Sequence, residues 1–311
     1  MLAIKLIQQQ GIEVEALNFC GFFCSCKAGS GVAESAKRLR VPLKTVEVDE
    51  KYLRMLRNPK HGYGRNMNPC VDCKIFMLKE AKKYARKIRA AFVFTGEVLD
   101  ERPMSQHYPA LKTIEEESGL NGRLLRPLSA KLLPETVVEK KGLVNRAKLL
   151  GIRGRGRKPQ IALAREFGVT SFPSPAGGCL LTEAEFAKRL RDLFLHSKRC
   201  TVADVALLRL GRHFRLGENK VIVGRNEQEN KALVVGKAAS DYVFEVPDIA
   251  GPITILQGKK TSKAVKTAAA LTAFYSDAKT DQVTVNYGRE KQDKTITVKR
   301  PSREEVDKLR V

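Results

Sequence analysis

Residues 12–49, IEVEALNFCGFFCSCKAGSGVAESAKRLRVPLKTVEVD, decide the fold class because their hydrophobic period changes twice. Apolar and polar residues alternate over residues 12–19 and again over 43–49, which predicts two strands. Residues 29–40, between them, predict a helix. Two strands joined by a helix are typical of a parallel sheet with crossover helices, so the chain begins as an α/β protein.

The same alternation of helix and strand continues on both sides of this stretch. Residues 2–10 predict a helix, residues 72–89 predict a basic amphipathic helix, and residues 91–95 predict a short apolar strand that ends at Gly96. Ligands of parallel α/β sheets bind beyond the carboxyl ends of the strands. We therefore expect a ligand site at the ends of two predicted strands, near Asn18, Phe19, Thr95 and Gly96.

The first predicted helix begins at the first residues of the sequence, which leaves no residue to cap it. A strand–helix–strand unit requires a strand before that helix. We therefore expect that a strand and its following loop precede Met1 in the full protein.

Charge is the most prominent feature of the composition. The 311 residues include 57 Lys and Arg against 34 Asp and Glu, which gives a net charge of +23. Residues 51–200 hold 31 of these basic and 14 of the acidic side chains. Such an excess predicts a polyanionic partner, and RNA or DNA is the commonest one. The alternative is a basic surface that contacts only solvent.

The seven cysteines are an odd number, and MLAIKLIQQQ at the start lacks a signal-peptide pattern. No apolar run approaches the length of about 18 residues that a membrane span needs. We therefore expect a protein of the reducing cytoplasm without a membrane partner. Its cysteines are then expected to be reactive or metal-binding rather than paired in disulfides.

A second, smaller α+β domain is expected after about residue 199. The runs VIVG, ALVVG, YVFEV, ITIL and QVTVNYG predict short strands, and residues 262–275 predict one helix. Before it, residues 128–168 are expected to be helical and basic. Residues 182–195 predict a helix with Thr182 as N-cap and Glu185 completing a capping box.

The motif Asn68-Pro69-Cys70-Val71-Asp72-Cys73 holds two thiols where a loop enters a helix. The N–H groups of a helix N-terminus and nearby cations lower the pKa of a thiol, so this motif predicts reactive cysteines. Two alternatives remain: a pair of buried structural cysteines, or a zinc site completed by two of Cys20, Cys24 and Cys26.

Several segments resemble enzymes that thiolate tRNA. NPCVDCK resembles the cysteine loop of tRNA 2-thiouridylases, and GGCLLTEAEFAKRL at residues 177–190 resembles their second cysteine segment. TGEVLDERPMSQ at residues 95–106 and RPLSAK at residues 126–131 are similar to the adenylation domain of tRNA 4-thiouridine synthetases. Both families are PP-loop ATP pyrophosphatases with the adenine nucleotide alpha hydrolase-like fold. The resemblance covers residues 1–190.

The resemblance implies a tRNA sulfurtransferase that uses ATP and Mg²⁺ to adenylate a uridine. A persulfide then attacks the activated carbon, with Cys73 and Cys179 as the two catalytic cysteines. A cysteine desulfurase or sulfur-carrier protein would supply the sulfur. Nucleotide-binding residues are implied at Ser105, Gln106 and Lys131, beside Thr95 and Gly96. The phosphate loop SGGxDS of these families is absent from this sequence, so we expect residues 1–311 to bind ATP weakly.

Some PP-loop thiolases instead hold a 4Fe–4S cluster with a CxxC pair and a distant third cysteine. Cys70, Cys73 and Cys179 match that arrangement, and thiolates are suitable ligands for such a cluster. The basic run at Arg153, Arg155, Arg157 and Lys158 predicts contacts to RNA phosphates, with a solvated surface as its alternative.

Residues 205–300 resemble the NFACT RNA-binding domain in the order of their segments: VIVGRNEQENKALV, ASDYVFEVPDIAGPITIL, TSKAVKTAAALTAFYSDAK and VTVNYG. The family's DxWxH strand reads DYVFE here, without Trp or His. The resemblance implies a tRNA partner. It also supports the alternative function, a non-catalytic RNA-binding protein, because the phosphate loop is absent.

Overall fold

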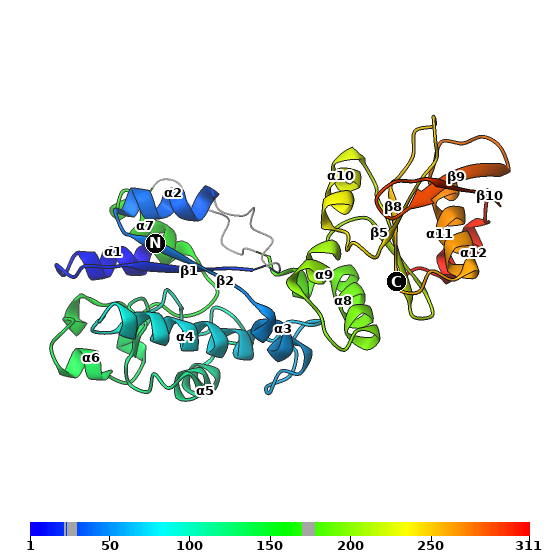
Figure 1. Ribbon diagram of the computed structural model, residues 1–311. Coiled ribbons are helices and arrows are strands. Elements are labelled where there is room, and N and C mark those ends of the chain that lie inside the picture. The colour runs from blue at the N-terminus through cyan, green and yellow to red at the C-terminus, as the bar shows by residue number, and fades with distance from the viewer. Residues whose placement is uncertain (22, 24–29, 170–177) are drawn as a thin grey trace. The chain divides into compact units, whose positions relative to one another are not determined.

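The structure, a computed structural model, describes residues 1–21, 23, 30–169 and 178–311. The chain forms two compact units, Met1–Glu183 and Ala184–Val311, and each is described separately (Figure 1). Within the described ranges, no helix is both long enough and apolar enough to cross a membrane.

The first unit alternates helices and strands, as the sequence predicts. Its α-helices are α1 (Leu2–Gln8), α2 (Ser30–Leu39), α3 (Glu50–Arg57), α4 (Cys70–Lys87), α5 (Tyr108–Ser118), α6 (Val137–Lys140) and α7 (Lys158–Glu166). Its strands are β1 (Ala16–Cys20), β2 (Leu43–Glu47), β3 (Val93–Phe94) and β4 (Leu124–Leu125). Short 3-10 helices lie at η1 (Ala130–Leu132), η2 (Arg146–Lys148) and η3 (Leu180–Thr182).

All strand pairs of the first unit are parallel, which confirms the expected α/β class. β1 pairs with β2 so that Asn18 lies opposite Thr45, and β3 pairs with β4 so that Val93 lies opposite Leu124. The described strands form two separate two-stranded sheets rather than one sheet. The strand predicted over residues 12–19 begins later, at Ala16.

Helix α1 contacts the hydrophobic cores of both sheets. Ile7 is fully buried against Leu125 of β4, while Ile4 packs against the cluster that contains Ala36 of α2 and Leu43 of β2. The faces of α4 and α5 that carry Ile75 and Ile114 form a further core with β4.

A cavity of about 450 Å³ lies between the two sheets. We call it the interstrand cavity. Its wall includes β1, β3 and the apolar face of α4, and the side chains of both strands are only half-buried. Strands of parallel sheets are normally buried on both faces, so this cavity separates two strands whose facing edges have no strand partner in the described chain.

Two predictions for the first unit are wrong. Residues 128–168 are mostly irregular, because Gly and Pro residues limit the α-helices there to α6 and α7. Thr182 does not cap the following helix: its hydroxyl donates to the carbonyl of Cys179 at 2.6 Å and closes the turn η3, so α8 begins at Ala184.

The second unit is an α+β domain, as expected. Its helices are α8 (Ala184–His196), α9 (Val202–Leu207), α10 (Glu227–Gly236), α11 (Ser262–Phe274) and α12 (Arg303–Lys308). Its strands are β5 (Arg212–Leu216), β6 (Asn219–Val223), β7 (Tyr242–Glu245), β8 (Thr254–Gln257), β9 (Gln282–Gly288) and β10 (Lys294–Lys299).

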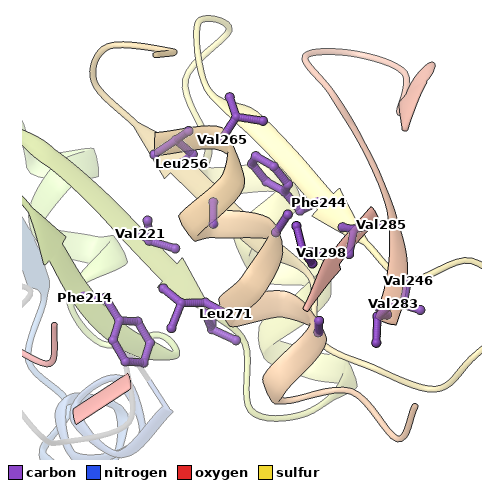
Figure 2. Close-up of a cluster of buried hydrophobic side chains, with 14 of the residues drawn as sticks. Phe214, Val221, Phe244, Val246, Leu256, Val265, Leu271, Val283, Val285 and Val298 are labelled. Carbon is purple, nitrogen blue, oxygen red and sulfur yellow. The ribbon is translucent and has the colours of Figure 1, made fainter. Parts of the chain in front are cut away.

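These strands form one six-stranded sheet in the order β10-β9-β7-β8-β6-β5, with antiparallel neighbours throughout. Alternate residues supply the two sides of the sheet. Val221 and Leu256 contact the core beneath α11 (Figure 2). On the other side, Ile222 and Ile255 contact Leu233 of α10. The sheet is therefore covered by helices on both faces.

The run ALVVG, predicted as a strand, is the end of helix α10. The side chain of Asn226 accepts a hydrogen bond from the Glu229 N–H at 3.0 Å and so caps that helix. Capping sets the conformation of the residues that follow, although Val234 and Val235 are β-branched and exposed.

Candidate functional site

A buried charge network lies at the carboxyl end of β3. The carboxylate of Glu97, 3% exposed, lies 3.2 Å from the Lys74 ammonium and 3.2 Å from the Arg126 guanidinium. Arg126 also pairs with Glu115 at 2.9 Å. Thr95 donates its hydroxyl proton to Glu97 at 3.0 Å. These cations hold the pKa of Glu97 below its ordinary value, against the opposing effect of burial.

A cavity of about 470 Å³, the Gly96 cavity, opens beside this network. Its volume is within the range of small-molecule sites, about 300–1,000 Å³. Its wall carries the cations Lys74, Arg102 and Arg157. Two amide side chains, Gln106 and Gln160, also line it, and each has a buried polar atom without a partner among the described residues.

The structure brings together some of the nucleotide-binding residues predicted from sequence. Thr95, Gly96 and Gln106 line the Gly96 cavity. Phe19 lines the interstrand cavity, together with Thr95 and Gly96. The other predicted residues line neither cavity. They are Asn18, half-buried in β1, Ser105, buried beside Gln106, and Lys131, exposed in η1.

The CxxC motif lies where a loop enters a helix, as predicted, but burial opposes the low thiol pKa expected for Cys73. Cys70 begins α4 and donates its thiol proton to the Asn68 side chain at 3.0 Å. The Cys73 sulfur lies 3.4 Å from the Tyr52 hydroxyl. Burial raises the pKa of the Cys73 thiol, and the lowering effects of Tyr52 and Lys74 do not overcome it.

The segment of Cys179 contacts the surroundings of Cys73. Leu180 donates its N–H to the carbonyl of Phe23 at 2.8 Å, and the Phe23 ring lies 5.6 Å from that of Tyr52. Contacts through Tyr52 and Phe23 therefore connect Cys73 with Leu180, the residue after Cys179. No cysteine is among the described residues that line the Gly96 cavity.

The described cysteines form no disulfide, and residues 1–21, 23, 30–169 and 178–311 contain no group of three or more His, Cys, Asp or Glu that could hold a metal ion. Cys70, Cys73 and Cys179 are thus not gathered as a ligand set for an iron–sulfur cluster. Cys24 and Cys26, the other candidates for a zinc site with Cys20, lie outside the described residues.

Two of the four residues in the basic run at 153–158 form ion pairs. Arg153 pairs with Asp100 at 2.6 Å and Arg157 with Glu101 at 3.5 Å. Arg155 and Lys158 are exposed and form no ion pair within the described chain.

In the second unit, an aromatic ring is surrounded by cations. The charged groups of Lys260, Arg289 and Lys294 lie 5.5, 5.9 and 5.6 Å from the centre of the half-buried Tyr242 ring. We call these four residues the Tyr242 platform. The Tyr287 ring lies 5.8 Å from that of Tyr242 and supports it. Base stacking on aromatic rings beside cations is a common mode of RNA binding.

Other basic residues of this unit are engaged inside it. Arg215 and Lys220 both pair with Asp192 of α8, at 2.5 and 3.1 Å. Burial lowers the pKa of Lys220 to about 8. His213 is buried, and its pKa lies well below the ordinary value for the same reason. Arg215 and Lys220 thereby hold α8 against the sheet, while the His213 ring bonds to the Leu210 carbonyl.

Sequence reasoning missed the Glu97 network and the Tyr242 platform. The partners of each are separated by tens of residues, so no local motif signals either one.

Comparison with known proteins finds a family that matches part of the chain. Residues 211–310 match the family NFACT-R_2, described as the NFACT protein RNA binding domain. This match confirms the resemblance stated for the second unit. No curated protein matches the chain. Among solved structures, one similar chain is the C-terminal part of the fibronectin/fibrinogen-binding protein of Streptococcus suis. It is 14% identical, with 78% of this chain and 99% of that chain covered, at a TM-score of 0.30.

Proposed function

We propose that this chain binds RNA through its second unit and that the RNA is a tRNA. The observation that carries the proposal is the match of residues 211–310 to an RNA-binding domain. The Tyr242 platform supports it with exposed cations, and residues 51–200 add 31 basic side chains against 14 acidic ones.

Titration of the full chain with labelled tRNA, followed by fluorescence anisotropy, tests this function. The logarithm of the binding constant should fall linearly with the logarithm of the salt concentration, because each neutralised phosphate releases counterions. Absence of binding at low salt, or binding that salt does not weaken, would contradict the proposal.

Variants of the basic run locate part of the contact. Arg155→Gln with Lys158→Gln should flatten the salt slope, because both side chains are exposed. Lys83→Gln is the matched control, since Lys83 is exposed on α4 and its charge is already paired with Glu80. An unchanged slope in the double variant would identify the run as a solvated surface.

A second candidate function, tRNA thiolation, is favoured by one specific observation. Lys74 and Arg102, whose positive charges oppose the rise in the pKa of Cys73 caused by burial, also line the Gly96 cavity. Two features of that cavity are compatible with a nucleotide. Arg102 forms no ion pair among the described residues and can face a phosphate, whereas Lys74 and Arg157 are paired with Glu97 and Glu101. Gln106 and Gln160, whose buried amide atoms have no partner among the described residues, can face a base. Mg²⁺ would be held chiefly by the phosphate oxygens.

The proposed reaction has two parts. ATP adenylates the uridine oxygen and releases pyrophosphate. The terminal sulfur of a persulfide on one cysteine then attacks the activated carbon, AMP leaves, and the base is joined to the enzyme by a disulfide. The thiol of the second cysteine attacks the enzyme sulfur of that bond. Thiolated tRNA is released, a Cys73–Cys179 disulfide forms, and an external dithiol reduces it. A desulfurase or carrier protein supplies the persulfide sulfur.

The interstrand cavity supports this candidate, because a further parallel strand would find open edges at both β1 and β3. Calorimetric titration of residues 1–311 with ATP should show weak binding. In a form that carries a preceding strand and phosphate loop, Cys73→Ser and Cys179→Ser should abolish thiolation and leave pyrophosphate release intact. Loss of both activities together would refute the assignment of these cysteines to sulfur transfer. Cys70→Ser should be harmless for the persulfide route and inactivating for a cluster.

A further inference from the structure

The second unit carries a surface hollow beside the Tyr242 platform. This hollow, about 640 Å³, is lined by Tyr242, by Arg289 and Lys291 of the turn after β9, and by Lys294 at the start of β10. Ala239 and the backbone of Gly288 complete one side of it.

The turn that forms this hollow is held close to the strand end. A β-carbon added at Gly288 would lie 1.8 Å from the carbonyl oxygen of Lys291, a distance that no side chain can occupy. Glycine at position 288 therefore lets residues 289–293 fold back against β9. This contact sets Arg289 and Lys294 on the same side as the Tyr242 ring.

The charges of the hollow are mixed and unpaired. Arg289, Lys291 and Lys294 are exposed, as are Glu290 and Asp293, and none of the five forms an ion pair within the described chain. Lys260 differs, because its ammonium donates to the carbonyls of Leu256 and Gly258, at 2.7 and 3.0 Å. Its charge is thereby held near the ring.

We infer that this hollow binds one unpaired nucleotide of the RNA. The base contacts the ring of Tyr242, and the phosphates that flank the nucleotide contact Arg289 and Lys294. An unpaired base offers a face to an aromatic ring, whereas a duplex presents only phosphates and groove edges. The carboxylates of Glu290 and Asp293 oppose a continuous row of phosphates, which further favours one splayed nucleotide over a helix. The inference rests on the proposed RNA-binding function and specifies its substrate class.

The contribution of the Tyr242 ring is tested by replacing it with an apolar side chain that has no aromatic face. Tyr242→Leu in the full chain should weaken binding of a single-stranded oligonucleotide by about 5- to 100-fold, the effect of one lost base–aromatic contact. Tyr242→Phe should bind as the original protein does. Tyr275→Leu is the matched control, because Tyr275 also lies under an arginine, Arg212, at 4.4 Å, but does not line the hollow.

The cations are tested by the salt slope. Arg289→Gln with Lys294→Gln should reduce the slope by about 0.7 for each lost phosphate contact to a single strand. Lys279→Gln, an exposed lysine outside the hollow, should leave it unchanged.

Two further readouts keep the outcome clear if a variant unfolds. An oligonucleotide with 2-aminopurine should lose fluorescence on binding through stacking, and this quenching should be absent with Tyr242→Leu. A blunt RNA duplex should compete poorly. Equal competition by the duplex, or full affinity and quenching with folded Tyr242→Leu, would overturn the site while leaving RNA binding intact. Failure of the unaltered chain to bind any RNA would instead refute the proposed function.

Discussion

Lys220 offers a quantitative test of which basic side chains serve the fold rather than RNA. It is 4% exposed on β6, and its only described carboxylate partner is Asp192, which also receives two hydrogen bonds from Arg215. We predict that Lys220→Met stabilises the second unit at pH 7. Methionine keeps most of the side-chain volume and removes the buried charge, while Arg215 still satisfies Asp192.

The magnitude follows from the pKa of Lys220, which burial lowers from 10.5 to about 8. One pKa unit corresponds to about 1.4 kcal/mol, so the charged form costs roughly 3 kcal/mol in the folded state. Below pH 8 this cost is fully present. It declines as pH rises from the folded pKa to the unfolded pKa, because the unfolded chain then binds more protons. The stability gained by Lys220→Met should therefore be greatest below pH 8 and disappear near pH 10.5.

The assay is the free energy of unfolding of the second unit, measured by hydrogen exchange of β5 and β6 peptides across a urea series, at pH 7 and pH 10. The chain has no tryptophan, so exchange is more informative than fluorescence. Lys231→Met is the matched control, because Lys231 forms a solvent-exposed ion pair with Glu227. This variant should change the free energy of unfolding by less than about 0.5 kcal/mol. Clear destabilisation by Lys220→Met at pH 7 would show that the attraction to Asp192 exceeds the cost of burial.

Three further experiments test other features of the fold. Glu97→Gln should destabilise the first unit by about 3–5 kcal/mol, measured by calorimetry, because it leaves Lys74 and Arg126 partly unpaired. This loss of stability should shrink as pH falls through the lowered pKa of Glu97. An unchanged stability would disprove the role of the network. Cys73 should react with iodoacetamide at least about tenfold more slowly than an exposed thiol at pH 7.5, and rapid labelling would contradict its raised pKa. Gly211→Ala should lower the free energy of unfolding by more than about 2 kcal/mol, because φ is +67° and the new β-carbon would lie 2.5 Å from the Val223 carbonyl. Gly217→Ala, where φ is +53° and the surrounding space is open, should lower it by less. Equal effects of the two variants would exclude the contact with Val223 as the cause.

Elements with strong local signals were predicted well from the sequence. Thr261 accepts a hydrogen bond from the Ala264 N–H at 3.2 Å, which caps α11, and the apolar spacing of that helix predicts its buried side. In β9 the alternation of Val283 and Val285 predicts their burial beneath α11. Both signals are contained in neighbouring residues, so they do not depend on the rest of the fold.

Strand β5 escaped prediction because its sequence, RHFRL, carries three polar residues among five. The structure accounts for them through partners elsewhere in the chain. The His213 ring bonds to the Leu210 carbonyl at 2.7 Å, and Arg215 pairs with Asp192, 23 residues away. Tertiary contacts thus permit a strand that local composition does not indicate.

The thiol of Cys73 shows the same limit for a candidate site. The helix N-terminus and basic neighbours, visible in the sequence, act to lower its pKa. Burial beside Tyr52, 21 residues earlier, reverses the result. If Cys73 carries sulfur, a change that exposes it or brings further cations close is required before it becomes a thiolate. Arg102 and Lys74 already lie on the side of the Gly96 cavity, so a nucleotide bound there would compete for them.

The net charge of +23 likewise conceals two populations of cations. Arg126 and Lys220 are buried and paired with carboxylates, and their charge stabilises or strains the fold without reaching a phosphate. Arg155, Arg289 and Lys294 are exposed and form no ion pair within the described chain, so phosphates can replace their water at little cost. Only the second population can contribute to the salt dependence of RNA binding. The size of the salt slope therefore measures how many exposed cations the RNA covers, and buried cations such as Arg126 and Lys220 do not add to it.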